Sequence, residues 1–291
     1  MSLLSSTQGT PERVWSLINL LAAHGGSLSR DEIFGWLSPP FTAGNEPRPI
    51  TGERDGQAIG AATSLDLVRR EGQLYSLTGA PPPSYPAFAD QVHGRLSKVD
   101  NSDPDFVVLE TFAWVVAEVE RRQSTTWVLG SSNEFADAVE HAIGGQESSG
   151  ERRFNSTKLA AWRRWIFLLG LGSDLPGNVV FYPYITERLG RELSVSGLPT
   201  DTDLPVDSVL RCISQSMPYL DGGTLFSQTA SRLALRLPPR KLSRVLSTAL
   251  RDLHDEGLIS LRVRGDSSDR FELALDGHHT INTVQTISLK G

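Results

Sequence analysis

The stretch PPRKLSRVLSTALRDLHDEGLISLRVRGDSSDRFELALD, residues 238–276, has the clearest order of secondary structure in the chain. In its first half, apolar residues recur at spacings of three and four, which places them on one side of a helix: Leu242, Val245, Leu246, Ala249, Leu250 and Leu253. Glu256-Gly257 is expected to end this helix. Residues 258–263 and 271–275 then alternate apolar and polar side chains around a turn at 265–269, which predicts a two-stranded ribbon.

An amphipathic helix followed by a ribbon resembles the recognition helix and wing of a winged helix-turn-helix domain. In that family the helix enters the major groove of DNA, and the wing contacts the backbone or the minor groove. Residues 11–78 predict a similar order of three helices and a hairpin, with Ser29 and Glu32 forming a capping box at the second helix. The resemblance therefore extends to the first third of the chain.

The same order can be followed three times along the sequence. Residues 105–182 and 206–275 each predict helices with a short strand between the first two, at 125–129 and 222–226. Gly25-Gly26-Ser27-Leu28 matches Gly222-Gly223-Thr224-Leu225, and Thr126 falls at the corresponding middle position. The near-equal spacing of positions 27, 126 and 224 predicts three tandem units.

The predicted fold is mainly α with short β-hairpins, an α+β chain of three consecutive winged-helix-like units. We expect a winged-helix-like domain at 1–80 and a proline-rich linker with a connecting helix at 81–103. A degenerate middle domain is expected at 104–200, and a C-terminal winged-helix domain with a short tail at 201–291.

Composition narrows the class of protein. The net charge of −6 over 291 residues argues against non-specific coating of DNA, which needs a positive surface. The single cysteine, Cys212, excludes a disulfide framework and a cysteine-based zinc site. The sequence has neither an apolar run long enough to cross a bilayer nor an amino terminus typical of a signal peptide. We therefore expect a cytoplasmic protein without a membrane partner.

The predicted DNA contacts are basic residues of the opening stretch. Arg240, Arg244 and Arg251 are spaced by four and seven residues, which is one face of a helix. The prediction assigns groove contact to Arg240, Lys241, Arg244 and Thr248, and phosphate contact to Arg251, Arg262, Arg264 and Arg270. The equivalents in the first domain, as DNA contacts or an interface, are Arg54, Gln57, Arg69 and Arg70. The competing interpretation is a solvated or protein-facing surface, because acidic residues dilute this charge.

Other motifs give no catalytic residue, metal site, cofactor or small-molecule substrate. The six histidines are scattered, and Gly170-Leu171-Gly172 lacks the lysine of a phosphate loop. Asp103 and Asp105 are better interpreted as a helix cap than as a nuclease cluster. Trp162 and Trp165 are expected in a core beside salt-bridged Arg163 and Arg164, or the four form a subunit interface.

A narrower resemblance comes from FNSTKLAAWRRWIFLLGLG at 154–172, followed by VFYP at 180–183. This sequence resembles DpdG proteins, which belong to bacterial gene clusters that install 7-deazaguanine bases in DNA. The resemblance implies an accessory role in DNA modification or phage defence, with helicase-like and nuclease-like protein partners and no catalytic residues.

Three functions are consistent with the sequence. The first is a non-enzymatic protein that binds double-stranded DNA within a multi-subunit complex. The second is a scaffold that uses winged helices for assembly without direct DNA contact, and the third is a transcriptional regulator. An enzyme with scattered catalytic residues has no support in any motif.

Overall fold

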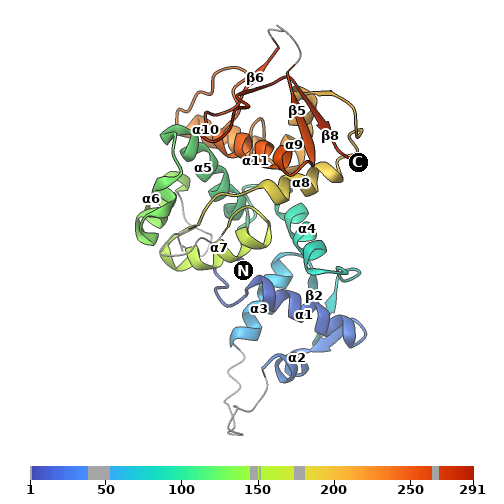
Figure 1. Cartoon of the computed structure of the whole chain (residues 1–291). Helices are drawn as coiled ribbons and strands as arrows, with labels where there is room; N and C mark the ends of the chain where they lie inside the picture. Colours follow the sequence, from blue (N-terminus) through green and yellow to red (C-terminus); the bar gives the residue numbers. More distant parts are fainter. Residues whose placement is uncertain (1, 39–52, 145–149, 151, 174–180, 264–268) are drawn as a thin grey trace. The chain divides into compact units, whose positions relative to one another are not determined.

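The computed structural model describes residues 2–38, 53–144, 150, 152–173, 181–263 and 269–291 (Figure 1). These residues are mainly helical with short antiparallel strands, which confirms the predicted fold class. The chain divides into two compact units: unit 1 comprises Met1–Val108 and Gln146–Leu169, and unit 2 comprises Leu109–Gly145 and Gly170–Gly291. The division into three winged-helix-like domains stays a prediction.

Unit 1 has the order of elements expected for the first third of the chain. Its elements are α1 (Pro11–Ala23), β1 (Ser27–Ser29), α2 (Arg30–Leu37), α3 (Glu53–Ser64), β2 (Val68–Glu71), β3 (Leu74–Leu77), α4 (Tyr85–Leu96) and α7 (Ser156–Leu168). The strands form an antiparallel sheet of order β1-β3-β2, so the strand after α1 pairs with the last strand of the hairpin. The proline- and glycine-rich sequence at 39–54 predicts a loop; residues 39–52 lie outside the described residues, and residues 53–54 belong to α3.

Local sequence signals explain where these elements begin and end. The amide of Glu32 donates to Ser29 Oγ at 3.3 Å, and the amide of Ser29 donates to Glu32 Oε2 at 2.8 Å. The predicted capping box at the start of α2 is therefore confirmed. The buried stripe of α1 contains Val14, Leu17 and Ile18, as the helical spacing predicts.

Tyr85 provides a test of the packing in unit 1. Its ring contacts those of Trp15 and Phe88, with centroids 5.9 and 5.8 Å away. Burial, followed by the charge of Glu12, raises the pKa of Tyr85 from 10.0 to about 12. The folded state therefore holds this proton more tightly, and the resulting stability is present below pH ~10 and lost as the pH rises towards ~12.

We expect Tyr85→Phe to reduce the loss of stability across this alkaline range, measured by urea unfolding at successive pH values. Glu12→Gln should lower the pKa of Tyr85 in an ultraviolet absorbance titration, because it removes a nearby negative charge. Identical alkaline unfolding of the wild type and Tyr85→Phe would contradict this packing.

Unit 2 contains most of α5 (Phe106–Arg122) and the remaining elements. These are a 3₁₀ helix (Thr126–Leu129), α6 (Ser132–Ile143), α8 (Thr186–Ser194), β4 (Leu204–Pro205), α9 (Val206–Ser216), α10 (Thr224–Arg232), α11 (Arg244–Asp255), β5 (Ile259–Arg262), β6 (Phe271–Glu272), β7 (Thr283–Val284) and β8 (Thr286–Leu289). The three-stranded sheet has the order β4-β8-β5, and β6 pairs with β7. None of the described helices is both long and apolar enough to span a membrane.

The two short strands expected at 125–129 and 222–226 are corrected by the structure. Residues 126–129 form the 3₁₀ helix, and Thr224 begins α10. Gly223 stands where a Cβ atom would lie 2.3 Å from the Pro218 carbonyl oxygen, so the second glycine pair forms a close turn into a helix. The first pair leads into β1, and the two motifs are not structural equivalents. The apolar run at 178–182 also predicts a strand, but most of it lies outside the described residues.

The ribbon expected at 258–275 is also wrong in its pairing. β5 pairs with β8 and β6 pairs with β7, so the segment expected to be a tail supplies two strands. The sheet β4-β8-β5 has the same order as β1-β3-β2, with the last strand in the middle. Unit 2 thus repeats the strand order of unit 1. In the sequence, β6 and β7 lie between β5 and β8, and they form a separate two-stranded sheet.

Candidate functional site

The predicted groove-binding residues lie around the start of α11. Arg244 and Thr248 are in the helix, whereas Arg240 and Lys241 are in the segment before it. Ser243 caps the helix, so Arg240 and Lys241 precede it and do not share a helical face with Arg244 and Arg251. Arg240 has a φ of +61° and pairs with Asp269. The single basic face expected from the spacing is therefore wrong, because the helix begins later than the pattern indicated.

Glu120 of α5 binds Lys241, which precedes α11, and Arg244, the first residue of α11. Its carboxylate, only 2% exposed, accepts the Lys241 ammonium at 3.1 Å and the Arg244 amide at 3.0 Å. The Arg244 guanidinium donates to Leu275 O at 3.0 Å and to Gln123 Oε1 at 3.4 Å. Lys241 and Arg244 thus have partners within unit 2.

Asp221 fixes the start of α11 from another element. Its carboxylate accepts both the amide and the hydroxyl of Ser243 at 2.6 Å, and Ser243 is fully buried. Burial raises the pKa of Asp221, while the Ser243 hydrogen bonds oppose this rise. The sequence analysis missed both Asp221 and Glu120, because neither carries a local motif.

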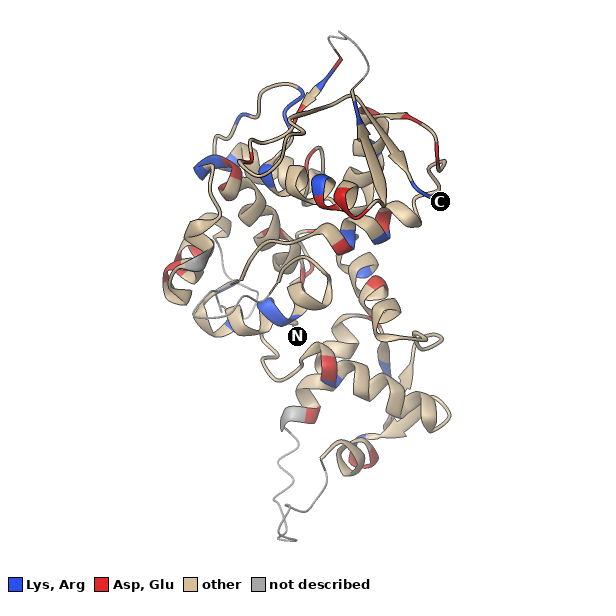
Figure 2. Cartoon of the chain, viewed as in Figure 1, with Lys and Arg blue, Asp and Glu red and all other residues tan. Residues whose placement is uncertain are grey.

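The other predicted phosphate contacts are placed differently. Arg251 is 1% exposed, its Nε donates to Ile281 O at 3.0 Å, and burial lowers its pKa. Arg262 remains on the surface and pairs with Asp203 at 3.0 Å, while Arg270 is half-buried. Arg264 lies outside the described residues. Basic and acidic positions are interspersed along the ribbon of unit 2 (Figure 2).

α11 has little exposed surface with which to enter the major groove of DNA. Each residue from Arg244 to His254 is buried or half-buried, and the first exposed residue is Asp255. A recognition helix needs side chains that reach base edges. In this arrangement Thr248 and Arg244 instead face a small recess.

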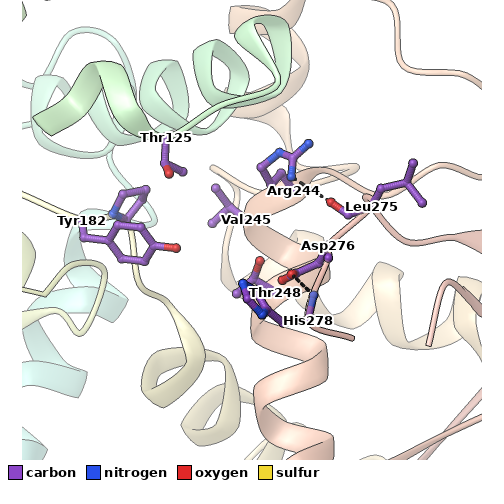
Figure 3. Close-up of a pocket in the computed structure, with 10 residues that line it drawn as sticks. Thr125, Tyr182, Arg244, Val245, Thr248, Leu275, Asp276 and His278 are labelled. Atoms are coloured by element: carbon purple, nitrogen blue, oxygen red, sulfur yellow. Dashed lines mark hydrogen bonds between the residues drawn. The ribbon is translucent and has the colours of Figure 1, made fainter. Parts of the chain in front are cut away.

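This recess is a polar cavity of about 330 Å³ at the amino-terminal half of α11 (Figure 3). Its lining consists of Thr125, Tyr182, Pro183, Arg244, Val245, Thr248, Leu275, Asp276, Gly277 and His278. Burial, followed by the charges of Asp252 and Asp276, raises the pKa of Tyr182. The His278 amide donates to Asp276 at 2.9 Å and lowers the pKa of that carboxyl. The polar side chains of this described lining are those of Thr125, Tyr182, Arg244, Thr248, Asp276 and His278.

The candidates of unit 1 are more accessible. Arg69 and Arg70 are exposed on β2; Arg69 pairs with Glu71 at 2.8 Å, and Arg70 Nε donates to Gly72 O at 3.0 Å. Gln57 lies half-buried on α3, where its side chain accepts the Gln8 amide at 2.7 Å. Arg54 is also in α3, but its side chain lies outside the described residues.

The interface candidates of α7 divide between the core and the surface. Trp162 and Trp165 are fully buried in unit 1, and Trp162 Nε1 donates to Val108 O at 3.0 Å. Arg164 is 57% exposed and lies 3.6 Å from Glu12. Arg163 lies over the Phe167 ring. The two tryptophans thus contribute to the core, and a partner could reach Arg164.

The described residues contain no group of three or more His, Cys, Asp or Glu side chains that could hold a metal ion. The structure is that of a mainly helical protein with two units, each of which contains a small antiparallel sheet. A family model described as DpdG-like matches residues 1–267. The chain belongs to the DpdG-like family, which confirms the resemblance found at 154–172 and suggests a role in a DNA-modification system. No curated protein and no solved structure matches the sequence.

Proposed function

We propose that the chain is a cytoplasmic, non-enzymatic accessory subunit of a DNA-modification or phage-defence system, and that unit 1 binds double-stranded DNA as a winged helix. The family supports the biological setting. The fold of unit 1 supports the mode of binding, because α3 precedes the hairpin of β2 and β3, and β1 completes the sheet. This is the order of a recognition helix and a wing.

One observation carries the choice of unit 1 over the C-terminal stretch. The hairpin of unit 1 exposes Arg69 and Arg70, whereas α11 is enclosed and its neighbouring cations are paired with carboxylates. The Arg69–Glu71 pair is more than half exposed on both sides, so it contributes little to stability. A DNA phosphate can therefore replace Glu71 as the partner of Arg69 at small cost.

The outward side of α3 suits a close approach to DNA. Its inward residues are buried, while the half-buried or exposed positions include Gly56, Gln57, Gly60 and Thr63. These side chains are small or uncharged, so they neither repel phosphates nor hold the backbone away from the groove. The Gln57 side chain is held by the Gln8 amide, so pairing with a base would require this hydrogen bond to break.

Charge reversal in the hairpin tests this proposal. We expect Arg69→Glu/Arg70→Glu to weaken binding of the full chain to a duplex by about tenfold or more at low salt, measured by fluorescence anisotropy. Arg262→Glu is the matched control, because Arg262 is an exposed arginine of the predicted C-terminal wing. Equal weakening by both variants would remove the preference for unit 1, and absence of duplex binding by the wild type would refute DNA binding.

A scaffold is the second candidate, and exposed apolar side chains in unit 2 favour it. Val195 is 79% exposed, Leu275 76% and Leu258 51%. A partner protein that covered these side chains would remove apolar surface from water, which favours association. A chain that recovers protein partners of the same gene cluster in pull-downs but binds no duplex would be a scaffold.

A further inference from the structure

Residues 2–9 of unit 1 form a folded segment, which we call the amino-terminal strap, beside α3 (Figure 1). Turns shape this strap: the amides of Ser5 and Ser6 donate to Ser2 O at 3.2 Å, and the Gly9 amide donates to Ser6 O at 2.7 Å. Of these residues, all of which the structure describes, only Gln8 is exposed. A segment enclosed in this way acts on a partner through the elements that it contacts.

The end of the strap lies against the first half of α3. The Gln8 amide donates to Gln57 Oε1 at 2.7 Å. A Cβ atom added to Gly9 would lie 2.6 Å from Gln57 O and 2.9 Å from the Ala61 Cβ atom. Gly9 does not have a positive φ, so the close contact, and not the backbone conformation, requires glycine here.

The beginning of the strap is tied to the last residue of α3 through Asp105. One oxygen of the Asp105 carboxylate accepts the Leu3 amide at 2.7 Å, and the other accepts the Ser64 hydroxyl. Asp105 is 2% exposed, so water competes little for these hydrogen bonds. Gln57, Ala61 and Ser64 are spaced by four and three residues, which places all contacts with the strap on one side of α3.

This side of α3 is next to the side that faces outward. The outward positions Gly56, Gly60 and Thr63 each directly precede a residue that contacts the strap or Asp105. Because successive residues of an α-helix are about 100° apart around its axis, the strap lies about a quarter-turn from the outward side. Elsewhere α3 packs against α1, α2 and β2. The strap and the core thus enclose α3 from two sides, which fixes its rotation about its own axis.

We propose that the amino-terminal strap positions α3 for DNA: by fixing the rotation of this helix, it determines which residues face the duplex. This inference rests on the proposed binding of DNA by unit 1. Gly9 and Asp105 are then positioning residues, because both are buried and act on the duplex only through α3.

Fluorescence anisotropy of the full chain with a duplex tests this role, at a temperature where circular dichroism shows each variant to be folded. We expect Gly9→Ala and Asp105→Ala each to weaken duplex binding about fivefold or more, because each displaces the strap from α3. Asp105→Asn should weaken binding less, since an amide oxygen can still accept the Leu3 amide. Gly94→Ala is the matched control, because a Cβ atom at this glycine of α4 would meet no atom within 4 Å.

A double-mutant cycle with Arg69→Glu/Arg70→Glu separates positioning from stability. If the strap places α3 so that helix and hairpin bind one duplex together, combining Gly9→Ala with the hairpin variant should cost less than the product of the two separate losses. A strap that only stabilised unit 1 would leave the affinity of the folded variants unchanged.

The outcomes distinguish the strap from DNA binding itself. Wild-type affinity in both Gly9→Ala and Asp105→Ala, an equal loss in Gly94→Ala, or losses that multiply independently in the cycle would each overturn the positioning role and leave DNA binding by unit 1 intact. Absence of duplex binding by the wild type refutes the proposed function, and the positioning role with it.

Discussion

Replacement of Glu120 by alanine is expected to lower the free energy of unfolding of unit 2 by about 3 kcal/mol. Glu120 is 2% exposed and accepts hydrogen bonds from the Lys241 ammonium, the Arg244 amide and the Gln123 side chain. Alanine leaves the Arg244 amide without its acceptor and the Lys241 charge without its partner. The loss comes from these unpaired groups as well as from the ion pair itself.

Urea unfolding combined with hydrogen exchange of α11 peptides measures this effect in unit 2. Glu120→Gln should cost less, because the amide oxygen can still accept the Arg244 amide. Glu256→Ala is the control, since Glu256 is exposed at the end of α11, and it should change stability by no more than about 0.5 kcal/mol. If α11 exchanges equally slowly in Glu120→Ala and the wild type, Glu120 does not hold the start of this helix.

Replacement of Trp162 by alanine is expected to lower the free energy of unfolding of unit 1 by about 4 kcal/mol. Trp162 is fully buried, donates a hydrogen bond to Val108 O and meets the Phe154 ring edge-on at 6.0 Å. Alanine creates a large cavity and leaves the Val108 carbonyl without this donor. A tryptophan that served only as a subunit anchor would not contribute in this way.

Trp36→Ala is the matched control, because Trp36 is a tryptophan of unit 1 with 61% of its surface exposed. It should cost less than about 1 kcal/mol in urea unfolding followed by circular dichroism. Similar costs for Trp162→Ala and Trp36→Ala would contradict the assignment of Trp162 to the core.

The sequence was sufficient to predict the three helices and the hairpin of residues 11–78, but not β1. The spacing of apolar residues predicts α1, and the Ser29 capping box predicts the start of α2. Glu71-Gly72 predicts a turn one residue before the observed one, because Glu71 is the last residue of β2 and pairs with Leu74. Gly72 adopts a φ of +62° in that turn, which glycine does without strain. These signals act within a few residues, so they can be recognised before the chain is folded.

Strand pairing in unit 2 depends on contacts that local patterns do not contain. β5 has the alternation of a wing strand, yet its partner is β8, which begins 24 residues after β5 ends at residue 262. β4 consists only of Leu204-Pro205 and has no alternation that could identify it. The helix α11 could be predicted, but its partners could not.

Contacts between residues far apart in the sequence also explain why the basic residues around α11 are paired or buried. The spacing of basic residues suggested a face for DNA, but Glu120 lies 121 residues from Lys241 in the sequence. Arg251 has the spacing of a surface cation and is buried beside Ile281. Local charge counts do not include carboxylates brought in from other elements, which is why the basic surface was overestimated.

Hydrogen exchange of the full chain with and without duplex DNA tests the central claim most directly. We predict slower exchange in peptides of α3 and the hairpin at 68–77 when DNA is bound, because contact restricts opening of these amides. Peptides covering 240–262 should exchange at the same rate with and without DNA. Protection confined to residues 240–262, with the hairpin unchanged, would contradict the assignment of DNA binding to unit 1.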